Sequence, residues 1–227
     1  NDNSRHGLLY RCCPTFEQGK SNSEKMGYAD TIAQRTTWKV TTAPASEPIS
    51  VADAKTYLNV TTTLHNALIT NIVSAARVMY EQYTDTAVIS QTITQVWDYT
   101  PCKEFELGVS PLITSTLPVL SYTDTNGSYQ TYDATNYTLD SISTLPRLVK
   151  KTTANWPSTG DFPNRWKCVY LAGYADAASV PEDIISSILL MVGFLYENRE
   201  DMPINDTNNP KIRSFASLAF KRRMHLI

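Results

Sequence analysis

The hydrophobic positions of residues 181–200 follow a helical period over most of the circumference. No side chain from 184 to 196 is charged, while a proline and two acidic residues at the start suit a first helical turn. The uncharged run is shorter than the roughly 20 residues that span a bilayer, so no membrane partner is expected. Ser186 and Gly193 fall together on the side opposite the bulkiest residues. We predict a central core helix whose small-residue side admits a close helix neighbour, including one from another subunit; the alternative is an ordinary core helix.

Three further segments have helical patterns. Ser50, with Asp53 three residues later, suits the start of a short helix that ends at Asn59. Residues 63–84 have one apolar half, and His65 near their start is expected to be structural. The polar half, which we expect outside the core, contains Asn66, Thr70, Ser74, Arg77 and Glu81. A last helix is expected from Pro210 onward, capped by Asn209, with apolar residues spaced i, i+3, i+4 and i+7.

The hydrophobic period changes from 3.6 to 2 at residues 87–100, which predicts a strand. One face of this strand contains Ile89, Gln91, Ile93, Gln95 and Trp97. Further short strands are expected at 104–107, 119–123, 129–132, 136–140, 147–150 and 166–171, and Asn126-Gly127 is a strong hairpin turn signal. Because the gaps are too short for helical crossovers, the sheet must be mostly antiparallel. Residues 38–48 are expected to be extended, because prolines at 44 and 48 exclude a helix there.

These elements predict an α+β fold, a small bundle of about four helices with an inserted, mostly antiparallel β-rich segment. Along the chain we expect an unassigned N-terminal extension at 1–37, a helical segment at 38–86, the β-rich insertion at 87–172, and a last segment at 173–227 in which the central helix, C-terminal helix and basic tail complete the bundle.

Charge is unevenly distributed along the 227 residues. The net charge of −2 does not indicate a nucleic-acid-binding protein. However, residues 207–227 hold five basic residues and no acidic one, which suggests that this tail meets an acidic surface. The alternative is a solvated basic helix end, favoured by the helix dipole. The apolar pair Leu226-Ile227 after the basic run favours docking.

Motifs for catalysis, metal binding or phosphate binding are absent from the sequence. The three histidines lie far apart, and the four cysteines lack zinc-type spacing. We therefore expect no catalytic residue, no metal and no cofactor, and a protein that is not an enzyme. The competing hypothesis is an enzyme or glycan-binding module that uses aromatic residues of the β insertion, namely Trp97, Tyr99, Tyr122, Tyr129 and Tyr132. Aromatic residues on strands more often form the sheet core or cross-strand pairs.

Three stretches of the chain resemble the head–tail connector (adaptor) proteins of tailed bacteriophages. They are EPISVADAKTYLNV at 47–60, LITNIVSAARVMYEQYTDTAVISQTIT at 68–94, and VYLAGYADAASVPEDIISSILLMVGFLYENRED at 169–201. The last stretch is the most specific. The resemblance covers roughly residues 40–227, with the middle β segment matching only in character. Residues 1–37 have no family counterpart, and the basic tail is not a family motif.

The resemblance implies a structural protein of the virion neck, assembled in the host cytoplasm. Such adaptors form a homo-oligomeric ring of twelve subunits beneath the portal, extend the DNA channel without sequence-specific DNA binding, and contact the next neck protein, the stopper. A stopper or tail-completion protein is the alternative. The C-terminal segment of adaptors docks on the portal, which here points to Arg213, Phe220, Lys221, Arg222, Arg223, Met224, His225, Leu226 and Ile227. Ser186 and Gly193 are the candidate subunit contacts.

Overall fold

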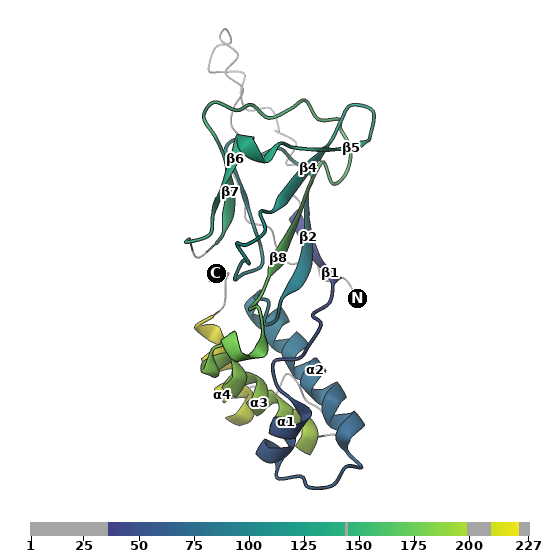
Figure 1. The fold of residues 1–227 in the computed structure, drawn as a ribbon, viewed down its shortest axis with the longest axis vertical. Helices are drawn as coiled ribbons and strands as arrows, with labels where there is room; N and C mark the ends of the chain where they lie inside the picture. Colours follow the sequence, from purple (N-terminus) through teal and green to yellow (C-terminus); the bar gives the residue numbers. More distant parts are fainter. Residues whose placement is uncertain (1–35, 144, 199–209, 223–227) are drawn as a thin grey trace, which may run out of the picture.

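The computed structural model describes residues 36–143, 145–198 and 210–222. The molecule is elongated, with a helical bundle at one end and a unit of two β-sheets at the other (Figure 1). The α+β fold expected from the sequence is confirmed.

The helical bundle contains all four α-helices of the described residues. They are α1 (Val51–Leu58), α2 (Asn66–Thr84), α3 (Glu182–Glu197) and α4 (Pro210–Phe220). The predicted cap of α1 is confirmed, because Ser50 Oγ accepts a hydrogen bond from the Asp53 amide at 3.1 Å. α2 begins at Asn66, three residues later than predicted. The Thr63 carbonyl accepts from the Asn66 amide in a turn that precedes the helix.

In the described part of the chain, the β unit has eight strands in two sheets. The strands are β1 (Thr36–Thr42), β2 (Gln91–Trp97), β3 (Glu104–Glu106), β4 (Val119–Thr123), β5 (Tyr129–Thr131), β6 (Tyr137–Asp140), β7 (Arg147–Lys150) and β8 (Trp166–Ala172), and short 3-10 turns lie at Ala134–Asn136 and Ala177–Ser179. The five-stranded sheet has the order β1-β2-β8-β4-β5, and the three-stranded sheet the order β3-β7-β6. All these pairings are antiparallel, as predicted.

The strand at the start of the described chain was predicted only as an extended lead. It is β1, and it pairs with β2 at the edge of the five-stranded sheet. The sheet therefore takes one strand from before the helices and the others from the segment after α2. The predicted hairpin at Asn126-Gly127 joins β4 to β5, with Gly127 at φ 85°, a value that favours glycine.

The described residues form two separate hydrophobic cores. The first lies in the bundle, where α3 packs against the other three helices and buries residues such as Ile188 and Val192. The second lies between the two sheets, where Phe105 of β3 contacts Trp97 and Trp166 at ring-centroid distances of 4.8 and 5.1 Å. The expectation that α3 is packed from several directions is confirmed.

Candidate functional site

The C-terminal helix α4 packs against the bundle through a narrow apolar side. Phe215 and Ala219 are buried, and the Phe215 ring lies 6.2 Å from Tyr80 and 5.7 Å from Tyr83 of α2. The predicted apolar spacing of this helix is therefore confirmed. Its predicted cap, Asn209, lies outside the described residues.

Ion pairs to the bundle flank this apolar contact at both ends of α4. Arg222 donates two hydrogen bonds to Asp183 in the first turn of α3, at 2.9 and 3.0 Å. This arginine lowers the pKa of Asp183. At the other end of α4, Lys211 pairs with Glu197. Two basic residues of the tail thus find their acidic partners in the same chain.

The other described docking candidates are open to solvent. Arg213 and Lys221 are exposed, and Phe220 is 52% exposed although it is a large apolar side chain. A shallow, open depression lies over the outward side of α4, lined by Arg213, Ser214, Ser217 and Leu218. Arg223, Met224, His225, Leu226 and Ile227 lie outside the described residues.

The two candidate subunit contacts on α3 differ in their surroundings. Gly193 is buried, and a Cβ placed on it would lie 3.2 Å from Cε1 of Tyr57 in α1. The close neighbour that this glycine admits is therefore a helix of the same chain. Ser186 is exposed.

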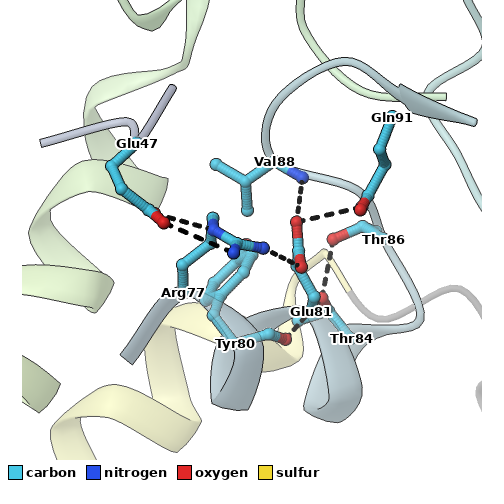
Figure 2. A network of polar contacts seen from close by, with 8 residues as sticks. All are labelled: Glu47, Arg77, Tyr80, Glu81, Thr84, Thr86, Val88 and Gln91. Carbon is cyan, nitrogen blue, oxygen red and sulfur yellow. Dashed lines mark hydrogen bonds and ion pairs between the residues drawn. The ribbon is translucent and has the colours of Figure 1, made fainter. Parts of the chain in front are cut away.

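A network of polar contacts joins the bundle to the β unit (Figure 2). Its centre is Arg77 of α2, whose side chain is 8% exposed and pairs with Glu47 and Glu81, each at 2.7 Å. Glu47 belongs to the segment that leads into α1. The expectation that Arg77 and Glu81 lie outside the core is wrong, because the preceding segment and the α2–β2 connection cover this side of the helix.

Glu81 continues the network into the connection between α2 and β2. One of its carboxylate oxygens accepts from the Val88 amide at 2.9 Å and from the Gln91 side chain at 3.1 Å. Burial raises the pKa of Glu81, while the Val88 amide and Arg77 act in the opposite direction. Gln91 points inward from β2 to meet this carboxylate. The sequence feature that could have indicated a buried acidic partner is the glutamine on the inward, otherwise apolar face of the alternating strand.

The second connection between the β unit and the bundle passes through Gly173. This glycine has φ 115°, and a Cβ on it would lie 2.4 Å from the carbonyl oxygen of Ile89. The flanking backbone is tied to the first connection, since Tyr174 donates to Val88 and Ser90 donates to Tyr174. Ala-Gly-Tyr at 172–174, part of the connector-like stretch at 169–201, thus has a structural cause, the close passage of two chain segments.

Among the described residues, no group of three or more His, Cys, Asp or Glu residues is placed to bind a metal ion. Cys168 is a buried thiol whose pKa is raised by burial, an environment that suppresses thiolate chemistry. His65 binds the Tyr196 hydroxyl at 2.6 Å, which confirms its structural role. None of the described helices is long and apolar enough to cross a membrane.

The aromatic residues proposed as a glycan platform mostly belong to the sheet core. Trp97 and Tyr132 are buried, and Tyr99 and Tyr122 pack against that core. Tyr129 is 46% exposed, and the Lys167 ammonium lies 4.1 Å from its ring centroid. One exposed ring bound to a lysine does not form a stacking platform, so the structure does not support that hypothesis.

The comparisons with known proteins found likeness in fold alone. No protein-family profile matches the chain, and no curated protein matches it. A chain in the neck of an empty gene transfer agent (GTA) particle, computed with C6 symmetry, has a similar structure with a TM-score of 0.67 at 20% identity. A chain in the virion of the native GTA particle gives 0.65 at 20%, and one in the neck of the native particle, computed with C12 symmetry, gives 0.65 at 19%. Each match covers 84% of this chain and 97% of the other, so the bundle and the β unit are shared as one arrangement.

Proposed function

We propose that this protein is a structural component of a virion neck. The observation that carries the proposal is the shared fold with chains of GTA necks, which extends over 97% of those chains. The connector-like stretch at 169–201 supports the same assignment independently, because it was identified from the sequence. It contains Gly173, which lies in one of the two connections between bundle and β unit, and α3, which fills the core of the bundle.

Within the neck, we assign the chain the role of the adaptor. In this role twelve copies form a ring beneath the portal, extend the DNA channel, and present a surface to the stopper. The C12 symmetry used for one of the similar necks agrees with such a ring. The elongated shape also suits an adaptor, because its helical and β ends provide separate surfaces for two partners (Figure 1). DNA passes through the channel without sequence-specific contacts.

The portal-docking surface in this proposal is the outward side of α4 with the tail that follows it. Exposed Arg213, Phe220 and Lys221 supply apolar and cationic contacts, and residues 223–227 extend them. Ser186 is retained as a subunit contact because it is exposed. Gly193 takes part in the proposal only through the packing of α1, since Tyr57 covers it.

Electron microscopy of the assembled neck tests the proposal. The adaptor role predicts density for this chain directly on the portal, in a ring of twelve, with α4 nearest the portal. A position one layer further out would identify a stopper or tail-completion protein. Recombinant protein that forms no ring by itself and none on the portal would contradict both roles.

A further inference from the structure

The two sheets of the β unit leave two outer faces on opposite sides of the molecule. Their inner faces meet in the aromatic core around Phe105 and Trp166. In Figure 1, β6 and β7 lie on one side of this unit and β1 and β2 on the other. Strand alternation and the observed registers assign every strand residue to an inner or an outer face.

The outer face of the five-stranded sheet, here called the basic face, is apolar at its centre and positive. Val96, Val119, Val169 and Leu171 point outward and belong to neither hydrophobic core. Threonines surround them, on β1 and β2. Among the described strand residues of this face none is acidic, while Lys39 and Lys167 are basic. An open antiparallel face is normally polar, so an apolar stripe here indicates a binding surface.

The outer face of the three-stranded sheet, here called the acidic face, has the opposite charge. Leu148 and Phe105 point into the core, so their strand neighbours point outward. The outward residues are Glu104 and Glu106 of β3, Arg147 and Val149 of β7, and Thr138 and Asp140 of β6. Three acidic residues and one basic residue leave this face net negative. Directly beyond the strand ends lie Lys103 and Lys151 next to the acidic face, and Asp98, Asp124 and Arg165 next to the basic face, so the contrast belongs to the strand residues themselves.

Ile142, in the turn that follows β6, adds an exposed apolar side chain to the acidic side. Asp140 accepts hydrogen bonds from the Ile142 and Ser143 amides and from the Ser143 hydroxyl, and it pairs with Arg147 at 2.9 Å. These contacts fix the turn, yet Ile142 is 97% exposed. Because the backbone around this side chain is already held, its insertion into a partner would cost less ordering than that of a free loop.

We propose that the basic face of one copy binds the acidic face of the next copy in a ring. This inference rests on the proposed ring-forming function and assigns its subunit interface. The apolar stripe of the basic face meets Val149 and Ile142, while Lys39 and Lys167 meet the carboxylates. Opposite charges across an interface fix register and suppress wrong pairings.

The placement of the two faces determines the type of assembly. Because they differ and lie on opposite sides of one unit, the contact is head-to-tail, and such contacts generate rings when the rotation closes. A second copy fits the basic face better than DNA does. Its centre is apolar, whereas phosphate contacts need cationic and hydrogen-bonding groups along the whole path.

Two charge variants of the full chain test this interface. Lys39→Glu with Lys167→Glu makes the basic face negative. Glu104→Gln with Glu106→Lys makes the acidic face positive. In the wild-type chain Arg147 donates to Glu104 at 3.2 Å, and a glutamine at this position can still accept that hydrogen bond. Each variant alone is expected to raise the concentration for half-assembly by roughly tenfold or more, since like charges then face each other. Mass photometry and negative-stain microscopy measure the assembly.

The equimolar mixture of the two variants is the decisive sample. Every contact in a ring of alternating variants again joins opposite charges, so we expect mixed rings at wild-type concentrations, which also shows that both variants fold. Thr138→Lys, at an exposed position of the acidic face, is a second variant for that face. Lys55→Glu with Thr70→Glu in the bundle is the control and should assemble normally. If the chain assembles only on the portal, the same samples are scored as portal-bound rings.

The outcomes separate this interface from the proposed function. If both variants form rings at the same concentration as the wild-type chain, the proposed interface is wrong and the adaptor role is unaffected. A Lys39→Glu, Lys167→Glu chain that assembles normally but loses DNA binding overturns it in favour of a DNA-facing surface. A wild-type chain that forms no ring alone or on the portal contradicts the function itself.

Discussion

Arg77 and its partner Glu81 join three segments of the chain, the lead into α1, helix α2 and the α2–β2 connection. Its removal would leave the Glu81 carboxylate in a largely buried position without its cation. We expect Arg77→Ala to lower the free energy of unfolding by about 3 kcal/mol, the usual cost of breaking a buried pair from one side. Urea denaturation measures this change. Lys211→Ala, which removes a pair that is 37% and 60% exposed, is the control and should cost under about 1 kcal/mol. Equal effects of the two variants would refute a structural role for the network.

Gly173 lies where the two connections between bundle and β unit pass close to each other. We expect Gly173→Ala to destabilise the protein by about 2 kcal/mol or more, because the new Cβ would meet the Ile89 carbonyl oxygen at 2.4 Å. Gly127→Ala is the matched control. Gly127 also has a positive φ, but a Cβ there would meet Phe162 at an ordinary 3.4 Å. A thermal melt of both variants isolates the close approach, and similar melting temperatures would argue against it.

At the residue scale, local signals predicted local structure and failed where distant segments meet. Two local signals were confirmed: the helix start at Ser50 and Asp53, and the hairpin turn at Asn126-Gly127. Each depends only on residues close together in the sequence. The helical wheel of α2 treated Arg77 as solvent-facing because charged side chains seldom enter a core. Its partner Glu47 lies thirty residues earlier. Nothing in the period of α2 indicates that this segment returns to cover the helix.

At the scale of elements, the attachment of α4 is expected to depend on pH. Arg222 lowers the pKa of Asp183 in the folded chain. The ionised carboxylate therefore stabilises the attached helix fully above the ordinary aspartate pKa of about 3.9, and this contribution is lost as pH falls through the lowered folded value. Because both side chains are about 40% exposed, the effect should stay below about 1 kcal/mol.

Hydrogen-exchange protection of the α4 amides measures this dependence. Between pH 6 and pH 3, we expect protection to fall by up to about fivefold relative to that of α2. Asp183→Asn should abolish the difference between the two pH values. Protection that falls equally in Asp183→Asn would show that other groups cause the change.

The elements themselves could be predicted because their hydrophobic periods reflect which side each one buries. The apolar side of α4 and the inward face of β2 follow directly from spacing. Pairing partners could not be predicted in the same way. β1 has seven exposed residues, so no burial pattern in its sequence specifies β2 as its partner. Likewise, the basic tail predicted an acidic surface, but spacing could not indicate Asp183 and Glu197 of the same chain.

At the scale of the whole molecule, the two connections make the bundle and the β unit one body. The Arg77 network fixes the first connection, and the backbone bonds around Gly173 tie the second to it. Such a joint suits the proposed ring subunit, because contacts made by the β units would then set the positions of the helical bundles. The sequence resemblance pointed to neck proteins, whose fold the similar GTA neck chains share with this chain, whereas the two charged faces can be identified only when strand registers are known.

The tail provides the last test of the adaptor role. We expect deletion of residues 221–227 to weaken portal attachment at least about tenfold, since it removes a cationic and apolar segment beside the exposed Phe220. The fold should persist, because within the described residues the deletion removes one half-exposed ion pair, that of Arg222 with Asp183. Asp183→Asn breaks this pair and keeps the tail, so it should attach normally. Co-sedimentation with the portal protein compares the three chains. Unchanged attachment after the deletion would exclude tail docking, and an equal loss in Asp183→Asn would assign the effect to the seating of α4 on its own bundle.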